Sequence, residues 1–101
     1  MQEIIKKKLF NGKGEYRFLS SIFSDEIYVC LINDEYVAIS GFCPHYGGPL
    51  KLNSNNEFHC FWHDWKFDVN SLKCKNFSFK NKIKKYNVIN NTDHLIISYD
   101  N

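Results

Sequence analysis

The chain has 101 residues, about the size of one ordinary domain, and with 44% hydrophobic and 24% charged residues it can bury a core. Its 13 basic and 11 acidic side chains leave a formal net charge of +2, which is too balanced to argue for nucleic-acid binding. No apolar run of about 20 residues occurs, which excludes a membrane-spanning helix. No apolar run of the length found in secretory signal peptides follows Lys6-Lys7-Lys8, so we expect a cytoplasmic protein.

The first half of the chain is predicted to form short strands separated by turns. Aromatic residues make up 17% of the chain, and their flat rings pack well on pleated sheets. The clearest predicted strands are Glu26–Ile32 and Glu35–Ser40, because Asn33-Asp34 between them suits a tight hairpin. Earlier strands are predicted at Glu3–Leu9 and Tyr16–Leu19.

The second half contains two further strand pairs. Glu57–Phe61 and Trp65–Val69 flank a turn at His63-Asp64, and Ile83–Ile89 and His94–Tyr99 close the chain. We find no convincing helix, and at most one short turn near Leu19–Ser24. Many short strands with regular turns predict an all-β fold, a small antiparallel β-sandwich or barrel. We expect residues 1–101 to form a single domain.

Two loops combine cysteine and histidine in a regular pattern. The chain reads Cys43-x-His45, then fourteen residues, then Cys60-x-x-His63. Soft thiolate and imidazole ligands suit zinc or iron–sulfur chemistry. In the cytoplasm, cysteines are more often metal ligands or core residues than disulfide partners. The pattern therefore predicts a metal site, with structural zinc as the alternative to an iron–sulfur cluster.

The residues around these ligands indicate a family. The two stretches read Cys43-Pro44-His45-Tyr46-Gly47-Gly48-Pro49-Leu50 and Cys60-Phe61-Trp62-His63-Asp64-Trp65-Lys66-Phe67-Asp68. They resemble the two cluster-binding loops of Rieske [2Fe–2S] proteins, and a weaker similarity covers most of the chain. The resemblance implies a Rieske fold with both loops at one end and one cluster per chain. It also implies that Cys43 and Cys60 bind one iron, while His45 and His63 bind the other.

The resemblance is to the low-potential type of Rieske protein. Membrane-complex members have a disulfide that links the two loops, but Gly48 and Trp62 stand at those positions here. Asp64 replaces a frequent glycine, and no hydroxyl residue follows His63 to donate to a cluster sulfur. Hydrogen bonds to the cluster sulfurs stabilise the reduced state, and this chain has fewer residues that could donate them. We therefore expect a reduction potential of roughly −150 mV, near the lower end of the Rieske range.

Other cysteines and histidines are expected to be structural. Cys30 lies in an apolar run and reads as a small buried hydrophobe, and Cys74 reads as a packing residue at a strand start. Strand alternation places His59 on the face opposite Cys60, and His94 lies at a turn.

Residues beside the two loops suggest how a partner is met. Tyr46, Phe61 and Trp62 either cover the cluster or anchor the loops. Lys51 and Lys66 are available for electrostatic steering. The lysine clusters within residues 6–8 and 80–85 are interpreted first as charges on solvated strand edges. The second interpretation is that they steer an approaching partner protein.

The resemblance implies an electron-transfer protein that is not itself an enzyme. A flavin reductase would donate the electron and an oxygenase would accept it, and we expect a monomer with no nucleic-acid or membrane partner. Two other hypotheses remain: a Rieske-like small subunit of a larger reductase such as assimilatory nitrite reductase, and a zinc-stabilised interaction module. No G-x-G-x-x-G nucleotide fingerprint occurs, so we expect no direct hydride uptake from a nicotinamide.

Overall fold

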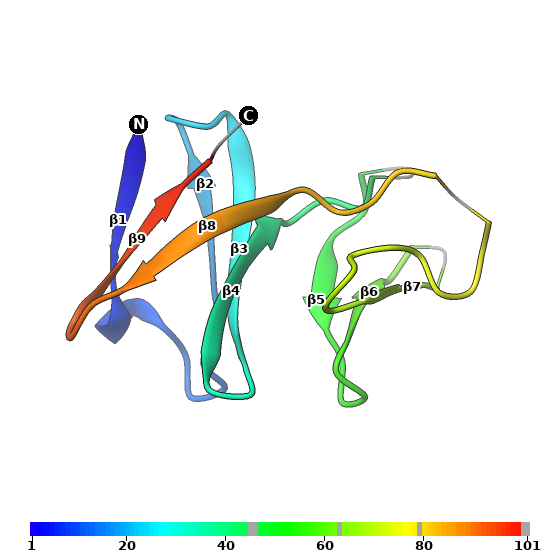
Figure 1. The fold of residues 1–101 in the computed structure, drawn as a ribbon, viewed down its shortest axis with the longest axis horizontal. Coiled ribbons are helices and arrows are strands. Elements are labelled where there is room, and N and C mark those ends of the chain that lie inside the picture. The colour runs from blue at the N-terminus through cyan, green and yellow to red at the C-terminus, as the bar shows by residue number, and fades with distance from the viewer. Residues whose placement is uncertain (45–46, 63, 79, 100–101) are drawn as a thin grey trace. The chain divides into compact units, whose positions relative to one another are not determined.

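The computed structural model describes residues 1–44, 47–62, 64–78 and 80–99. They form two compact units (Figure 1). The terminal unit comprises Met1–Ser40 and Lys85–Asn101, and the inserted unit comprises Gly41–Lys84. No helix in the described residues is long and apolar enough to cross a membrane.

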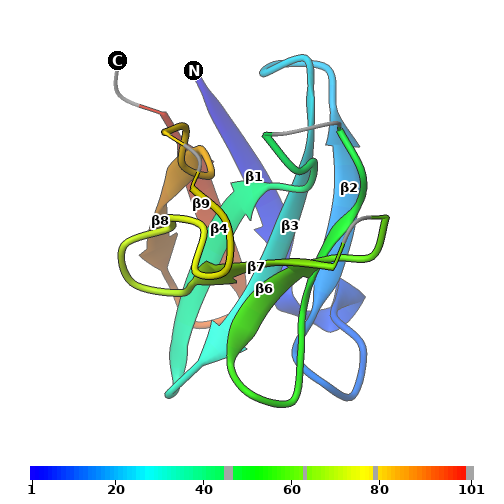
Figure 2. The ribbon, with the colours of Figure 1, turned by 90° about the vertical axis from the view of Figure 1, so that its right-hand side faces the viewer.

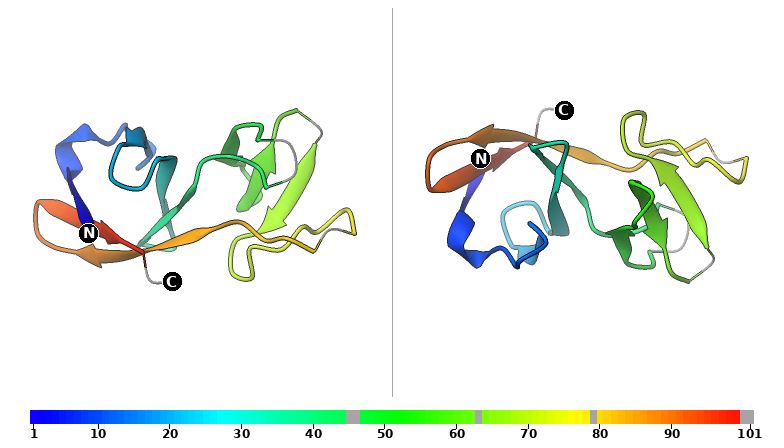
Figure 3. Two further views of the ribbon diagram at one scale, coloured as in Figure 1. Left: turned by 90° about the horizontal axis from the view of Figure 1, so that it is seen from above. Right: turned by 90° about the horizontal axis from the view of Figure 1, so that it is seen from below.

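The terminal unit is an antiparallel sheet with the strand order β1-β9-β8-β4-β3-β2. Its strands are β1 (Gln2–Lys6), β2 (Tyr16–Ser20), β3 (Asp25–Ile32), β4 (Glu35–Ser40), β8 (Lys85–Asn90) and β9 (His94–Ser98). Although β1 and β2 are the two edges of this sheet, Ser20 Oγ on β2 donates to Glu3 Oε2 on β1 at 2.6 Å. The sheet therefore curls until its edges meet, as Figure 3 shows for this unit.

One hydrophobic core fills the interior of the curled sheet. Its side chains come from β1, β3, β4, β8 and β9 and are almost fully buried: Ile5, Ile27, Val29, Ala38, Tyr86, Leu95 and Ile97. The β3–β4 hairpin turns at Asn33 and Asp34, whose φ angles of 51° and 65° are those that a type I′ turn requires. The predicted hairpin is therefore confirmed.

The inserted unit contains the short sheet β5-β6-β7. Its strands are β5 (Leu50–Leu52), β6 (Glu57–Cys60) and β7 (Trp65–Asp68), and β6 and β7 face the viewer in Figure 2. Burial alternates along β6, where Phe58 and Cys60 point inward and Glu57 and His59 point outward. Leu50, Phe67, Leu72 and Ile83 complete the buried interior.

The predicted all-β fold is confirmed, but several boundaries differ. The first strand ends at Lys6, and a 3₁₀ turn, η1 (Lys7–Leu9), follows because the Phe10 amide donates to Lys7 O at 3.1 Å. β8 begins at Lys85 and not at Ile83, because the Ile83 amide donates to Leu72 O at 3.0 Å within the inserted unit. β5 was not predicted at all. The assignment of residues 1–101 to a single domain stays a prediction.

Candidate metal centre

The β6–β7 hairpin places Cys60 at the start of the second loop. Cys60 is the last residue of β6 and pairs with Trp65, the first residue of β7, which leaves residues 61–64 as the connecting loop. The Cys60 side chain is fully buried. Asp64 closes the loop with φ 55°, a left-handed conformation in which glycine or asparagine is commoner. The predicted ligand His63 lies outside the described residues.

The first loop is closed by its own backbone. Phe42 and Pro49 form an antiparallel bridge at its base. Within it the Cys43 amide donates to Gly48 O at 2.7 Å, and the Gly47 amide donates to Cys43 O at 2.8 Å. Gly47 has φ 75°, which a glycine adopts without strain. Cys43 is 3% exposed, so its thiol faces the interior, while the predicted ligand His45 and its neighbour Tyr46 lie outside the described residues.

The strand register brings the two loops to one end of the small sheet. Leu50, the first residue of β5, pairs with Cys60 at the end of β6, and Cys60 pairs with Trp65 at the start of β7. The loop that ends before Leu50 and the loop that begins after Cys60 therefore leave the sheet at the same place. The prediction of two loops at one end is confirmed for this sheet.

Gly48 is the point at which the two loops touch. A β-carbon built on Gly48 would lie 2.9 Å from Cys60 Sγ and 2.9 Å from Trp62 Cδ2, closer than real Cβ contacts come. A side chain at position 48 would therefore collide with both the Cys60 sulfur and the Trp62 ring. From the sequence, Gly48 was predicted only to be a loop residue at the position of a disulfide cysteine in membrane-complex Rieske proteins. The close approach depends on a contact between residues twelve positions apart in the chain.

The donor set fits a thiolate-bound metal. Cys43 and Cys60 are both buried, and none of the four cysteines is in a disulfide. Thiolates are the ligands that soft metals and iron–sulfur clusters prefer. Among the described residues, no three His, Cys, Asp or Glu side chains come close enough to hold a metal ion. Two of the expected ligands lie outside those residues.

The other cysteines have different surroundings. Cys30 lies on β3 in the terminal unit and is fully buried, and burial first and the Glu15 carboxylate second raise the pKa of its thiol to about 12. A thiol with such a pKa is almost never a thiolate at neutral pH. Cys74 forms an isolated antiparallel β-bridge with Phe67 in the inserted unit, and Cys74 Sγ lies 3.5 Å from Asn76 Oδ1.

A polar cluster supports the second loop from outside. His59 Nε2 lies 2.6 Å from Asp64 Oδ1, and the Phe61 ring meets the His59 ring edge-on with centroids 4.9 Å apart. Asn76 donates to Asp64 O at 2.9 Å and accepts from the Lys66 amide at 3.0 Å. His59 is on the outer face, as alternation predicts, but its partnership with Asp64 was missed. The contact could have been predicted from the sequence, because a histidine and a carboxylate stand at opposite ends of one hairpin loop.

Exposed aromatic side chains surround the loops. Phe61 is 60% exposed and Trp62 is 61% exposed, and Phe42 beside Cys43 is 40% exposed. Large exposed apolar groups that gather at one place indicate a contact surface. Trp62 lies close to Gly48 at its buried part and is otherwise largely exposed, and the choice between covering the cluster and anchoring the loop stays a prediction.

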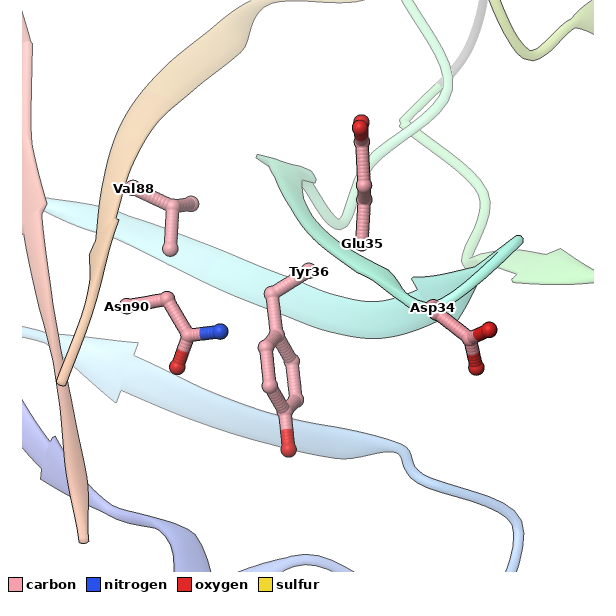
Figure 4. A pocket seen from close by; sticks show the side chains of 5 residues that line it. All are labelled: Asp34, Glu35, Tyr36, Val88 and Asn90. Carbon is pink, nitrogen blue, oxygen red and sulfur yellow. The ribbon is translucent and has the colours of Figure 1, made fainter. Parts of the chain in front are cut away.

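The terminal unit has a separate hollow with a largely polar lining. β4 and β8 pair at Ala38 with Tyr86 and at Ile39 with Lys85 and then diverge, which leaves a depression of about 210 Å³. It is lined by Asp34, Glu35, Tyr36, Val88 and Asn90 (Figure 4). Glu35 points away from the neighbouring Tyr36 ring, as adjacent strand residues do.

Comparison with known proteins identifies relatives of this arrangement. A family model described as "Rieske [2Fe-2S] domain" matches residues 3–87. Among solved structures, the ferredoxin of carbazole 1,9a-dioxygenase from Nocardioides aromaticivorans IC177 superposes with a TM-score of 0.77 at 17% identity, over 98% of each chain. The plasma membrane Rieske protein of the cyanobacterium Synechocystis PCC 6803 has a TM-score of 0.74 at 15% identity, over 94% of this chain and 96% of that chain.

A third solved structure is a complex. It is the reduced complex between oxygenase and ferredoxin in carbazole 1,9a-dioxygenase, with a TM-score of 0.74 at 15% identity over 95% of this chain and 27% of the matched chain. At these identities the structural matches establish the shared fold only. No curated protein sequence matches the chain.

Proposed function

This chain belongs to the Rieske [2Fe–2S] family, and from that membership we propose that it carries single electrons from a flavin reductase to an oxygenase-type enzyme. Its cofactor is a Rieske-type [2Fe–2S] cluster. Such a cluster takes up and releases one electron. The observation that supports this function best is that two buried cysteines outside any disulfide, Cys43 and Cys60, belong to the two loops at one end of the small sheet. We propose that the protein acts as a monomer in the cytoplasm and has no catalytic activity of its own.

The proposed ligands are Cys43, His45, Cys60 and His63. Cys43 and Cys60 would hold one iron, and His45 and His63 would hold the other. The loop hydrogen bonds of Cys43 and the strand pairing of Cys60 fix the backbone from which the two sulfurs project. Gly48 lies against Cys60 Sγ, which keeps water from that side of the sulfur.

The names of two similar solved structures support an oxygenase as the partner in this proposal. One similar solved structure is a dioxygenase ferredoxin that covers 98% of this chain, and another is a complex of that kind of ferredoxin with its oxygenase. The whole of this chain thus corresponds in fold to a free carrier. An oxygenase acceptor is the partner that this correspondence favours.

Purification without oxygen tests the proposal. We expect brown protein with about two irons and two labile sulfides per chain, and a reduced-state spin-resonance signal of Rieske type. The reduced protein should then deliver its electron in one-electron steps to an added Rieske-type dioxygenase. Colourless protein that holds one zinc would contradict the proposal.

A further inference from the structure

The inserted unit is more basic than the rest of the chain. Residues 41–84 contain seven lysines and three carboxylate side chains, a formal net charge of +4. The terminal unit has six basic and eight acidic side chains, a formal net charge of −2. The near-neutral total therefore conceals a positive unit, and it is the unit that contains both proposed cluster loops.

The carboxylates of the inserted unit are already engaged within it. Glu57 Oε2 accepts from Lys75 Nζ at 2.6 Å, and Asp68 Oδ1 accepts from the amides of Asn70 and Ser71 at 2.8 and 2.7 Å. Asp64 contacts His59. Lys75 is therefore paired with Glu57, but the seven lysines of the unit outnumber its three carboxylates, so the unit keeps an excess of positive charge.

Two of the lysines lie at the loop end of the small sheet. Lys51 and Lys66 both pair with His59, so the three side chains form one row on the outer face. Each lysine directly follows a strand partner of Cys60, namely Leu50 or Trp65. The exposed rings of Phe42, Phe61 and Trp62 belong to the same two loops. Apolar rings with charges around them are the usual anatomy of a protein interface.

We propose that the inserted unit docks on its electron acceptor through these aromatic rings and lysines, and that the acceptor presents an acidic surface with an apolar centre. This inference rests on the proposed electron-transfer function. Charge complementarity raises the rate of encounter and orients the two proteins, which a short-lived electron-transfer complex requires. A long polyanion such as nucleic acid is disfavoured, because the remaining chain is net negative.

Oxidation of the reduced protein by two small complexes of opposite charge tests the sign of this surface. Ferricyanide, an anion, and tris(phenanthroline)cobalt(III), a cation, each take one electron from the reduced cluster, and each metal falls by one oxidation state. We expect the ferricyanide rate to fall as salt is added and the cobalt rate to rise. Poly-aspartate should slow the ferricyanide reaction, whereas polylysine should not.

A pair of double variants locates the charge. Lys51→Gln with Lys66→Gln should slow ferricyanide oxidation about fivefold at low salt, and the difference should vanish at high salt. Lys8→Gln with Lys13→Gln removes the same charge from exposed positions of the terminal unit and should change the rate much less. Spin-resonance spectra and the reduction potential of each variant show whether the cluster itself is unchanged.

The outcomes separate the inference from the proposed function. An intact cluster with a reversed or absent salt dependence, or with equal effects from the two double variants, overturns the acidic-partner inference alone. Binding of duplex DNA at physiological salt, tighter than that of poly-aspartate, overturns it in favour of a nucleic-acid partner. Protein without a redox-active cluster overturns the proposed function and the inference together.

Discussion

His59 Nε2 lies 2.6 Å from Asp64 Oδ1, so a single contact ties the end of β6 to the last residue of the loop before β7. Asp64 has a left-handed conformation with φ 55°, which costs a non-glycine residue about 1–2 kcal/mol. The loop between them contains the proposed ligand His63. The polar cluster outside the sheet therefore supports the loop that the cofactor needs.

The His59–Asp64 contact should show a small, measurable coupling energy. Asp64 is 74% exposed, which limits the coupling to about 0.5–1 kcal/mol. A double-mutant cycle of His59→Ala and Asp64→Ala, followed by urea unfolding, measures it. Asp64→Gly should cost less than Asp64→Ala, because glycine adopts positive φ freely. Equal costs for these two substitutions would contradict the conformational argument.

Gly48→Ala should damage the metal centre, because it adds a methyl group where the two loops are closely packed. The added carbon would meet both Cys60 Sγ and Trp62 at 2.9 Å, and overpacking of this kind costs about 1–3 kcal/mol. Iron content and the urea midpoint should both fall. Gly12→Ala is the matched control, since nothing lies within 4 Å of a β-carbon there. A Gly48→Ala protein with normal iron content and stability would show that the loops do not meet as described.

The cysteines should divide into ligands and a core residue. Cys43→Ser or Cys60→Ala should abolish cluster assembly, as iron and sulfide assays would show. Cys30→Ala should keep the cluster and lose about 1–2 kcal/mol of stability, because it leaves a small cavity on β3. In the folded protein Cys30 should also resist alkylation at pH 8, since burial raises its pKa to about 12. Loss of colour in a folded Cys30→Ala variant would overturn this division.

Replacement of a proposed histidine ligand should change the potential in a known direction. In His45→Cys a negative thiolate replaces a neutral imidazole, which makes addition of an electron harder and lowers the reduction potential. Protein-film voltammetry measures the change. An unchanged or higher potential in a variant that still binds a cluster would argue against His45 as a ligand.

Asp68 should contribute to stability only above acidic pH. Hydrogen bonds from the backbone amides of Ser71 and Asn70 hold the pKa of Asp68 below its ordinary value of about 3.9. Because the folded-state pKa is the lower one, this stabilisation is present above about pH 4 and is lost as the pH falls through the folded pKa. Urea midpoints from pH 6 to pH 3, followed by circular dichroism, should fall less steeply for Asp68→Asn. Parallel curves for the two proteins would count against this role.

Local sequence patterns were reliable where neighbours along the chain decide the structure. Glu35–Ser40 alternates and follows Asn33-Asp34, and it forms β4 with the predicted bounds. Ile83 shows where this reasoning fails. Its apolar side chain suits a strand, but its amide bonds to Leu72 O, so it belongs to the inserted unit and not to β8.

The all-β class, the tight hairpin and the family of the two Cys–His loops could be predicted from the order of residues alone, because strand alternation, turn residues and ligand spacing are all local along the chain. Three features are visible only once the chain is folded: the close approach of Gly48 to Cys60 Sγ and Trp62, the contact of His59 with Asp64, and the Ser20–Glu3 hydrogen bond between the sheet edges. Each of these is a contact through space between side chains or loops. Such contacts depend on strand register and burial, which the order of residues in any one segment does not specify.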